Sequence, residues 1–366
     1  MNTKVITNRI EGLDLLRFGA AFSVLFYHYF FIGPLQGFWP INQFFSLFHF
    51  GDFGVDVFFI ISGLVISISA EGRRVYQFAV ARFIRIMPAF VACSIITAIS
   101  SSLLPGVAAS EIFIRWLASL TFYPQLFGLE SISGVYWTLQ IELKFYVIVA
   151  LFLAFRVWST YKFSVIIPVW LIISLINVFY LHNLFLKDFL ITEYTGHFVA
   201  GMLLYQIRRG EQNSFTPLGF LLSGILIWNH CVGFESWIGG TFKYSFSDIG
   251  TFLIAPICIA LVYYVSGIKT VPINSKLLAL LGGMSYTLYL LHADFGFFIR
   301  AMTDRWLFAK FPGATSIINN QLVVLIAIFS SLILAAVVVI YIEPPLRRAL
   351  KRVFTPKVPE TTVDIR

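Results

Sequence analysis

Charged side chains are scarce in this sequence. Only 12% of its residues are Asp, Glu, Lys or Arg, whereas 58% are hydrophobic. An ordinary soluble domain has about 25% charged and roughly 45–50% apolar residues. A water-soluble fold of 366 residues could not bury so much apolar surface. The composition therefore excludes a soluble globular protein and predicts an integral membrane protein.

Cysteine is also rare, with three residues in the chain. Cys93, Cys231 and Cys258 lie in apolar runs and have neither paired nor metal-ligand spacing, which argues against a disulfide framework and a metal site. The sequence also lacks a Walker loop, a dinucleotide fingerprint and a Gly-x-Ser-x-Gly elbow. We therefore expect no metal and none of the chemistries that these motifs support.

Apolar runs long enough to cross a bilayer, about 20 residues each, recur along nearly the whole chain. They predict an all-α polytopic membrane bundle of about ten transmembrane helices. The predicted spans are residues 13–33, 52–70, 83–104, 137–157, 163–182, 190–207, 217–233, 247–266, 277–299 and 320–342. Residues 112–127 are apolar but short and contain Arg115 and Pro124, which predicts an interfacial or re-entrant helix. One transmembrane domain thus covers residues 1–346, and residues 347–366 form a basic cytoplasmic tail.

The basic residues divide unevenly between the two sides of this predicted bundle. With the N-terminus inside, 18 of the 26 Lys and Arg residues fall on inner segments and six on outer loops. Because cytoplasmic loops are enriched in Lys and Arg, we expect both termini in the cytoplasm. Topology and anionic lipid account for the net charge of +8, and no basic stripe interleaved with exposed aromatics argues for nucleic acid.

Ionisable side chains within the first predicted span mark a functional interior by default, because the bilayer penalises them. This span contains Asp14, Arg17 and His28 and lacks a clear cleavage site, so we expect it to be retained rather than removed as a signal peptide. Arg17 and His28 lie on nearly the same helix face, roughly 16 Å apart along the axis. The alternative is an arginine that snorkels to the interface and a histidine that is hydrogen-bonded in the core.

Two later segments add charged groups to the apolar phase. Asp56 enters the second span with no adjacent cation. Arg82 and Arg85, three residues apart on one helix face, suit phosphate recognition, although headgroup anchoring is the commoner use of such a pair.

Two further spans place polar side chains on one helix face. Glu142 and Tyr146, four residues apart, could handle a proton or take part in a structural ion pair. Ser285, Tyr289 and His292 share one side of the ninth span, where small polar groups also serve helix packing.

Taken together, these segments resemble acyltransferase family three, the bacterial transmembrane O-acyltransferases that modify surface polysaccharides and some secondary metabolites. The resemblance extends from Gly12 to about Arg347 and rests on six motifs in the same order. They are Arg-x10-His at Arg17 and His28, Gly-Val-Asp-x-Phe-Phe-x-x-Ser-Gly from Gly54 to Gly63, Arg-x-x-Arg at Arg82 and Arg85, Trp-Thr-Leu-x-x-Glu from Trp137 to Glu142, Gly-x-Ser-Tyr-x-x-Tyr-x-x-His from Gly283 to His292, and Glu-x-Pro at Glu343. Some larger members carry an extra periplasmic hydrolase-like domain, and we expect this chain to be a stand-alone member.

The resemblance implies an O-acyltransferase of the bacterial inner membrane. Its donor is expected to be cytoplasmic acyl-coenzyme A, usually acetyl-coenzyme A, and its acceptor a hydroxyl of an envelope saccharide such as lipid-linked O-antigen of lipopolysaccharide. We expect His28 to act as general base or transient acyl carrier, oriented by Glu142. The other expected roles are the thioester or its oxyanion for Ser285 and Tyr289, the donor phosphates for Arg17, Arg82 and Arg85, and support for the substrate or the site for Asp56, Trp137, Tyr146 and His292.

Two alternatives from other classes accompany this prediction. A secondary transporter is equally compatible with intramembrane charges and about ten spans, but it predicts inverted internal symmetry and broken helices, and the sequence has neither. A noncatalytic membrane scaffold leaves Arg17, His28 and Glu142 unexplained. The sequence identifies neither the acceptor sugar nor the oligomeric state.

Overall fold

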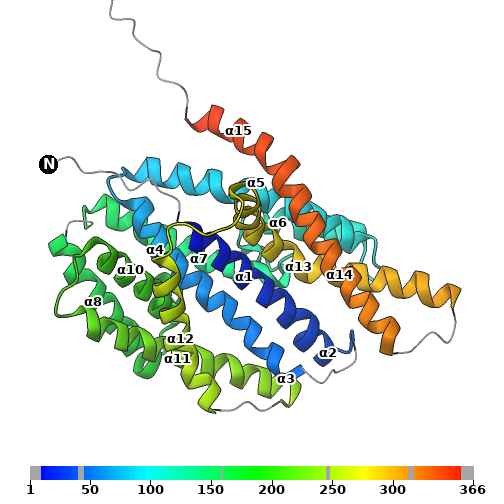
Figure 1. The fold of residues 1–366 in the computed structure, drawn as a ribbon, viewed down its shortest axis with the longest axis horizontal. Coiled ribbons are helices and arrows are strands. Elements are labelled where there is room, and N and C mark those ends of the chain that lie inside the picture. Colours follow the sequence, from blue (N-terminus) through cyan, green and yellow to red (C-terminus); the bar gives the residue numbers. More distant parts are fainter. Residues whose placement is uncertain (1–9, 40–44, 158–159, 245–247, 312–316, 356–366) are drawn as a thin grey trace, which may run out of the picture.

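The computed structural model describes residues 10–39, 45–157, 160–244, 248–311 and 317–355. Helices make up the regular structure of these residues, and this part of the chain contains no strand (Figure 1). The longer α-helices are α1 (Glu11–Tyr27), α4 (Gly54–Ala70), α5 (Val75–Ser102), α7 (Trp137–Ala154), α8 (Thr160–Ile176), α10 (Thr195–Arg209), α11 (Thr216–Phe242), α12 (Asp248–Ser266), α13 (Ser275–Lys310), α14 (Ile317–Val337) and α15 (Glu343–Phe354). The predicted all-α helical bundle is confirmed.

Within the described ranges, eight helical segments are long and apolar enough to cross a membrane. They are Glu11–Leu35, Phe45–Ala70, Val75–Ser102, Gly134–Ala154, Phe163–Leu181, Thr216–Phe242, Ile249–Ser266 and Gln321–Phe354. The other two predicted spans, 190–207 and 277–299, fall on α10 and α13. α10 has only 15 residues, and α13 has 36 residues with several charged groups among them. The chain is thus a polytopic membrane protein, and α10 and α13 remain predicted spans.

Short helices connect these long ones. They are α2 (Gly33–Leu35), α3 (Phe45–Phe48), α6 (Ala109–Ser119), α9 (Leu184–Phe189) and the 3₁₀ segments His49–Phe53, Pro124–Phe127 and Gly134–Tyr136. The predicted interfacial or re-entrant segment at 112–127 corresponds to α6 and the 3₁₀ turn that follows it. α6 has 11 residues, too few for a crossing that needs about 20.

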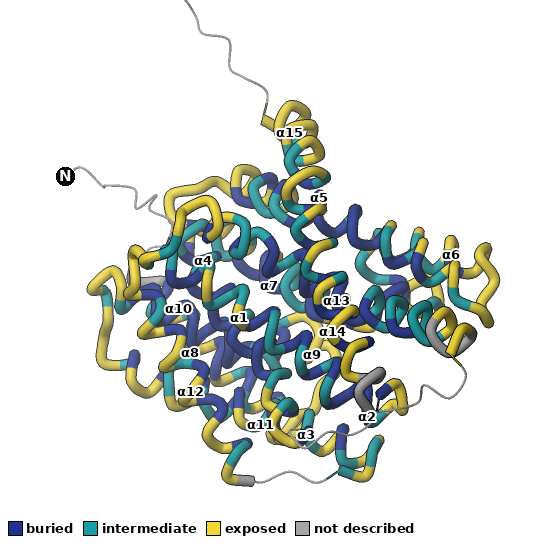
Figure 2. The backbone as a smooth tube through the Cα atoms, turned by 45° about the vertical axis from the view of Figure 1, so that its right-hand side comes forward, coloured by how far each residue is buried: buried dark blue, intermediate teal, exposed yellow. Residues whose placement is uncertain are grey.

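The tight packing of α4 against α10 depends on glycine. A Cβ added to Gly63 would lie 2.1 Å from the carbonyl oxygen of Phe198, and one added to Gly201 would lie 2.1 Å from that of Ile60. Small residues let membrane helices approach at backbone distance because little else attracts them in lipid. Figure 2 shows the resulting buried region, in dark blue, where α4 and α10 lie close to α1 and α7.

α1 continues beyond Tyr27 as a π-helical segment, η1 (His28–Ile32), whose side chains contact α13. Tyr29 of η1 is fully buried, and its hydroxyl donates to the carbonyl oxygen of His292 at 2.7 Å. Gly296 leaves the space for this ring, since a Cβ there would overlap the Tyr29 hydroxyl at 1.6 Å. π-helical turns inside α-helices occur frequently at functional sites, and here the turn begins at the predicted catalytic histidine.

π-helical segments also occur at η5 (Asn177–Leu181) and at η6 (Val338–Ile342), through which α14 continues into α15. α15 passes alongside α5 (Figure 1), and the C-terminal end of α15 contacts α5. The hydroxyl of Tyr76 donates to the carbonyl oxygen of Phe354 at 3.1 Å, and the rings of Phe83 and Phe354 meet edge to face at 5.4 Å. α15 is mostly exposed (Figure 2) but is fixed relative to α5 by these contacts.

Candidate active site

A cavity of about 730 Å³ lies among α1, α4, α5, α7, α13 and α15. Sites for small molecules typically enclose about 300–1,000 Å³, so this cavity is large enough to hold a ligand the size of a cofactor. Its lining includes seven residues that the sequence predicted for the site: Arg17, Arg82, Arg85, Glu142, Tyr146, Ser285 and Tyr289. These seven side chains come from four helices that are distant in the sequence, namely α1, α5, α7 and α13, and they converge on one cavity.

Cationic side chains dominate the charged part of this lining. Among the described residues, six cations line it against three carboxylates: Arg17, Arg82, Arg85, Arg347, Arg348 and Lys351 against Asp14, Glu142 and Glu343. The excess of positive charge favours an anionic ligand, and guanidinium groups match phosphate in particular.

The arginines predicted to bind phosphate have donors that no group among the described residues satisfies. Arg82 donates to the hydroxyl of Ser69 at 2.9 Å, but its buried Nε has no partner within the described residues. Arg17 and Arg85 make no hydrogen bond or ion pair in the same part of the chain. Burial and the neighbouring charge of Arg82 lower the pKa of Arg73, which lies in the loop before α5. Positive charge is therefore concentrated around Arg82.

The carboxylate of Glu142 is held by two hydroxyl groups of the cavity wall. Tyr146, one turn further along α7, donates to it at 2.5 Å, and Ser62 of α4 donates at 3.2 Å. All three residues line the cavity. The carboxyl group of Glu142 thus links α4 to α7 at the cavity wall.

α13 contributes three hydroxyl-bearing side chains to the wall. Ser285 is buried and donates to the carbonyl oxygen of Gly282 at 2.8 Å, so its own helix satisfies it. Tyr289 lines the cavity as predicted. Tyr286 lines it as well, and its buried hydroxyl has no partner in the described ranges. A buried hydroxyl without a partner is costly, so Tyr286 is a candidate donor to a bound ligand.

His28 forms a pair with His292. Its Nδ1 lies 3.1 Å from Nε2 of His292 and 3.0 Å from the carbonyl oxygen of Val24. Nδ1 of His292 lies 2.7 Å from the carbonyl oxygen of Tyr289 and 3.2 Å from that of Leu288. Carbonyl oxygens only accept, so neutral His292 carries its proton on Nδ1 and accepts at Nε2. His28 then donates from Nδ1, which leaves its Nε2 as a free base.

The histidine pair lies beside the cavity rather than in its lining. Tyr289 connects the two, because it lines the cavity and its ring centre lies 5.6 Å from that of His292. His28 is half-buried and His292 fully buried. The sequence predicted that Glu142 orients His28. In the structure Glu142 contacts Ser62 and Tyr146, and the orienting contact to His28 comes from His292.

Two predicted supporting residues lie away from the cavity. Asp56 is buried, and its carboxylate is 2.5 Å from Nε2 of His197 on α10, so it joins α4 to α10. Trp137 is 40% exposed and packs its ring against Phe59 and Tyr194. Both residues therefore support the helices around the site rather than its wall.

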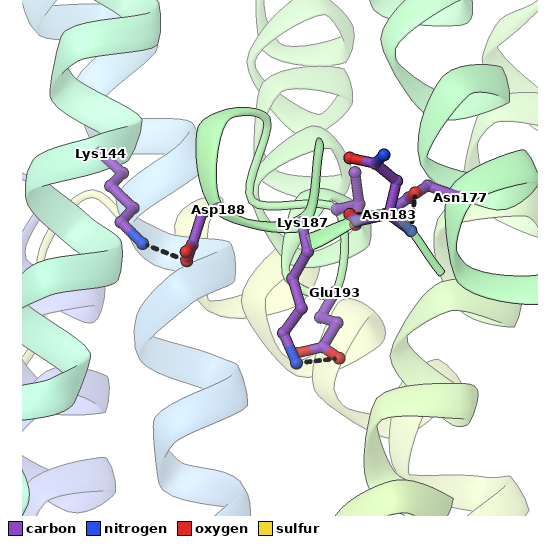
Figure 3. A network of polar contacts seen from close by, with 7 residues as sticks. Lys144, Asn177, Asn183, Lys187, Asp188 and Glu193 are labelled. Carbon is purple, nitrogen blue, oxygen red and sulfur yellow. Dashed lines mark hydrogen bonds and ion pairs between the residues drawn. The ribbon is translucent and has the colours of Figure 1, made fainter. Parts of the chain in front are cut away.

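Lys144 lies between Glu142 and Tyr146 in the sequence of α7, but its side chain does not line the cavity with theirs. Its Nζ is 2.7 Å from the carboxylate of Asp188 in α9 (Figure 3). The same region contains an ion pair between Lys187 and Glu193 at 2.8 Å (Figure 3). Lys144 thus takes part in a peripheral ion pair and contributes nothing to the charge of the cavity.

The sequence did not predict several residues of the cavity wall. They are Ser62, Tyr286, Arg347, Arg348 and Lys351. Ser62 and Tyr286 do lie within predicted motifs, whereas the cations of α15 were assigned to a tail. In the described ranges, no group of three or more His, Cys, Asp or Glu side chains is placed to hold a metal ion.

Comparisons with known proteins agree with this architecture. A family model described as an acyltransferase domain matches residues 10–340. Nodulation protein 10 of Rhizobium leguminosarum bv. viciae is 29% identical over 175 residues, which cover 42% of this chain and 46% of that protein. The match thus spans less than half the length of this relative. No solved structure gives a significant match.

Proposed function

Because the chain belongs to the acyltransferase family matched over residues 10–340, we propose that it is an O-acyltransferase with acyl-coenzyme A, most simply acetyl-coenzyme A, as donor. The proposed acceptor is a hydroxyl of a bacterial envelope saccharide, such as lipid-linked O-antigen. Family membership favours group transfer over the transporter and scaffold alternatives. We further propose that the protein lies in the inner membrane with both termini in the cytoplasm, as the positive-inside distribution indicates.

One observation supports this function most. Arg17, Arg82 and Arg85 line the cavity, and Tyr289 connects the cavity to a histidine pair. Arg17 and His28 are separated by eleven residues of one helix, about 16 Å along its axis. An acyl-coenzyme A has the same polarity, with phosphates at one end and a thioester at the other end of a narrow arm. The cations would bind the phosphates while the thioester approaches His28.

The proposed chemistry uses the free Nε2 of His28. This nitrogen accepts the proton of the acceptor hydroxyl as the hydroxyl oxygen attacks the thioester carbonyl carbon. A C–O bond forms, the C–S bond breaks, and the thiolate of coenzyme A leaves and takes up the proton from His28. During the step His28 carries a positive charge, and the hydrogen bond from its Nδ1 to His292 stabilises that charge.

The negative charge that develops on the carbonyl oxygen needs a donor. Tyr289, which lies between the cavity and the histidine pair, is the proposed donor. Tyr286 is a second candidate, because its buried hydroxyl has no partner among the described residues. Ser285 would serve only after leaving the carbonyl oxygen of Gly282. In a two-step route the same Nε2 would attack the thioester and carry the acyl group before the acceptor arrives.

The direct test compares envelope glycans from cells with wild-type protein, His28→Ala protein and no protein. We expect ester-linked acetyl groups only with the wild type, measured by mass spectrometry before and after mild alkali. Cys258→Ala, a buried change outside the cavity, is the matched control and should retain acetylation. Equal acetyl content with and without the gene would overturn the proposed acceptor class.

A second assay isolates the donor. Purified protein with radiolabelled acetyl-coenzyme A and extracted envelope glycan should transfer label to the glycan, and His28→Ala should not. If His28→Ala retains wild-type turnover, the role proposed for His28 is wrong.

A further inference from the structure

α15 lies beyond residue 340, where the family match ends, yet it forms part of the cavity wall. Arg347, Arg348 and Lys351 line the cavity from this helix, and Arg82 and Arg85 line it from the neighbouring helix α5. Their spacings of three and four place the three α15 cations on one helix face. Two helices therefore present like charges to one cavity.

The near end of α15 is fixed by a buried carboxylate. Glu343 is 5% exposed and accepts from the hydroxyl of Thr287 on α13 at 2.7 Å and from Arg347 at 2.8 Å. The far end is held against α5 through Phe354. α15 is thus anchored at both ends, and its inner face has a defined position relative to α5.

Arg347 has an unused donor at this position. Only its Nη2 is bonded to Glu343, and its buried Nε has no partner within the described residues. Nε of Arg82 on α5 has the same property. Two buried guanidinium donors of one cavity, from neighbouring helices and without partners among the described residues, indicate a bound anion.

The charge balance indicates what kind of anion this is. Five cations line the cavity from these helices, two from α5 and three from α15, and the pair with Glu343 offsets the charge of Arg347. The remaining like charges favour a ligand that carries several negative charges. Coenzyme A carries a diphosphate and a ribose phosphate. A phospholipid headgroup offers the same phosphate chemistry with less charge, and it would contact the exposed outer face of α15 rather than the half-buried Arg347.

We propose that α15 forms the second wall of a phosphate-binding site, in which Arg347, Arg348 and Lys351 bind the phosphates of the acyl donor together with Arg82 and Arg85. This inference rests on the proposed function, because it takes the donor to be an acyl-coenzyme A. It extends the site to a helix beyond the family match.

The test measures equilibrium binding of coenzyme A to the full-length protein in nanodiscs of neutral phosphatidylcholine. The main variant is Arg348→Gln/Lys351→Gln, since both side chains are exposed and the pair between Glu343 and Arg347 stays intact. We expect a rise in Kd of about 10- to 100-fold, because each lost charge-assisted hydrogen bond weakens binding up to about tenfold. Adding Arg347→Gln should weaken binding further. Pantetheine, which has no phosphate, should bind these variants and the wild type equally.

The matched control is Arg352→Gln, a cation of the same helix that does not line the cavity. Its Kd for coenzyme A should stay within about twofold of the wild type, since a distant exposed charge contributes little. If Arg352→Gln raises the Kd as much as the double variant does, the overall positive charge of α15 attracts coenzyme A without a defined binding site. That result would overturn the inference.

The remaining outcomes separate this inference from the proposed function. If Arg85→Gln no longer binds coenzyme A while the α15 variants bind it like the wild type, the proposed site on α15 is wrong, but coenzyme A remains supported as the donor. If the folded wild type does not bind coenzyme A at all, the proposed donor is wrong as well. If the α15 variants lose affinity only for nanodiscs or vesicles containing phosphatidylglycerol, the cations bind lipid headgroups and the inference is overturned.

Discussion

His28 and His292 are 264 residues apart in the chain, yet their rings meet with Nδ1 of the first 3.1 Å from Nε2 of the second. The backbone of α13 determines the outcome of this contact. Its carbonyl oxygens at Leu288 and Tyr289 hold the proton of His292 on Nδ1, so only Nε2 remains to accept from His28. Nδ1 of His28 thus faces two acceptors, Nε2 of His292 and the carbonyl oxygen of Val24, and together they favour the tautomer of His28 in which Nε2 is basic.

The role of His292 predicts a difference between two substitutions. His292→Gln places an amide oxygen near the former Nε2 and can still accept from His28, whereas His292→Leu cannot. We expect kcat to fall by about 10²-fold or more for His292→Leu, the scale of a lost general base, and by less than about tenfold for His292→Gln. The measurement is acetyl transfer at saturating donor, with thermal stability of both variants as control. Equal losses in two equally stable variants would mean that His292 has only a packing role.

The approach of α4 to α10 predicts a second pair of outcomes. A methyl group on Gly63 would meet the backbone oxygen of Phe198 at 2.1 Å, whereas one on Gly224 of α11 would meet nothing within 4 Å. Gly63→Ala must separate the two backbones, and we expect a loss of stability of about 1–3 kcal/mol or more. Gly224→Ala should be neutral or slightly stabilising. Thermal unfolding in detergent measures both, and a stable Gly63→Ala protein would contradict the close packing.

The sequence predicted the helices and much of the cavity wall because both depend on patterns within a single segment of the chain. Arg82 with Arg85 and Glu142 with Tyr146 share a face at spacings of three and four, and each pair lines the cavity. Apolar runs likewise predicted where helices lie, since a bilayer requires about 20 apolar residues whatever their neighbours are.

Contacts between distant segments could not be predicted in this way. His197, the partner of Asp56, is 141 residues away, and no spacing within either helix encodes that contact. The place of the α15 cations in the cavity wall was not predicted, for a different reason. A basic amphipathic helix beside a membrane has the same pattern whether it binds headgroups or a cavity ligand, and only packing against α5 distinguishes the two.

Lys144 provides a prediction of no effect. It lies two residues from Glu142 but pairs with the exposed Asp188, and exposed ion pairs contribute about 0–1 kcal/mol. Lys144→Ala should keep kcat/KM for acetyl-coenzyme A within about twofold of the wild type. The comparison is Glu142→Gln, which removes the charge that lies in the cavity and should lower transfer clearly. A Lys144→Ala protein as inactive as Glu142→Gln would mean that the lysine serves the reaction.

Arg85 tests the division of the cavity into a binding end and a reacting end. It lines the cavity and has no hydrogen bond or ion pair among the described residues, so its charge is available to a ligand. If it binds the donor equally in the ground state and the transition state, its loss raises KM and leaves kcat unchanged. We expect Arg85→Gln to raise the KM for acetyl-coenzyme A by about tenfold while kcat stays within about twofold. His28→Ala should show the opposite pattern, with kcat lost and donor binding kept. An Arg85→Gln protein with normal KM and low kcat would place this arginine at the reacting end, and the polarity proposed for the bound donor would then have to be reversed.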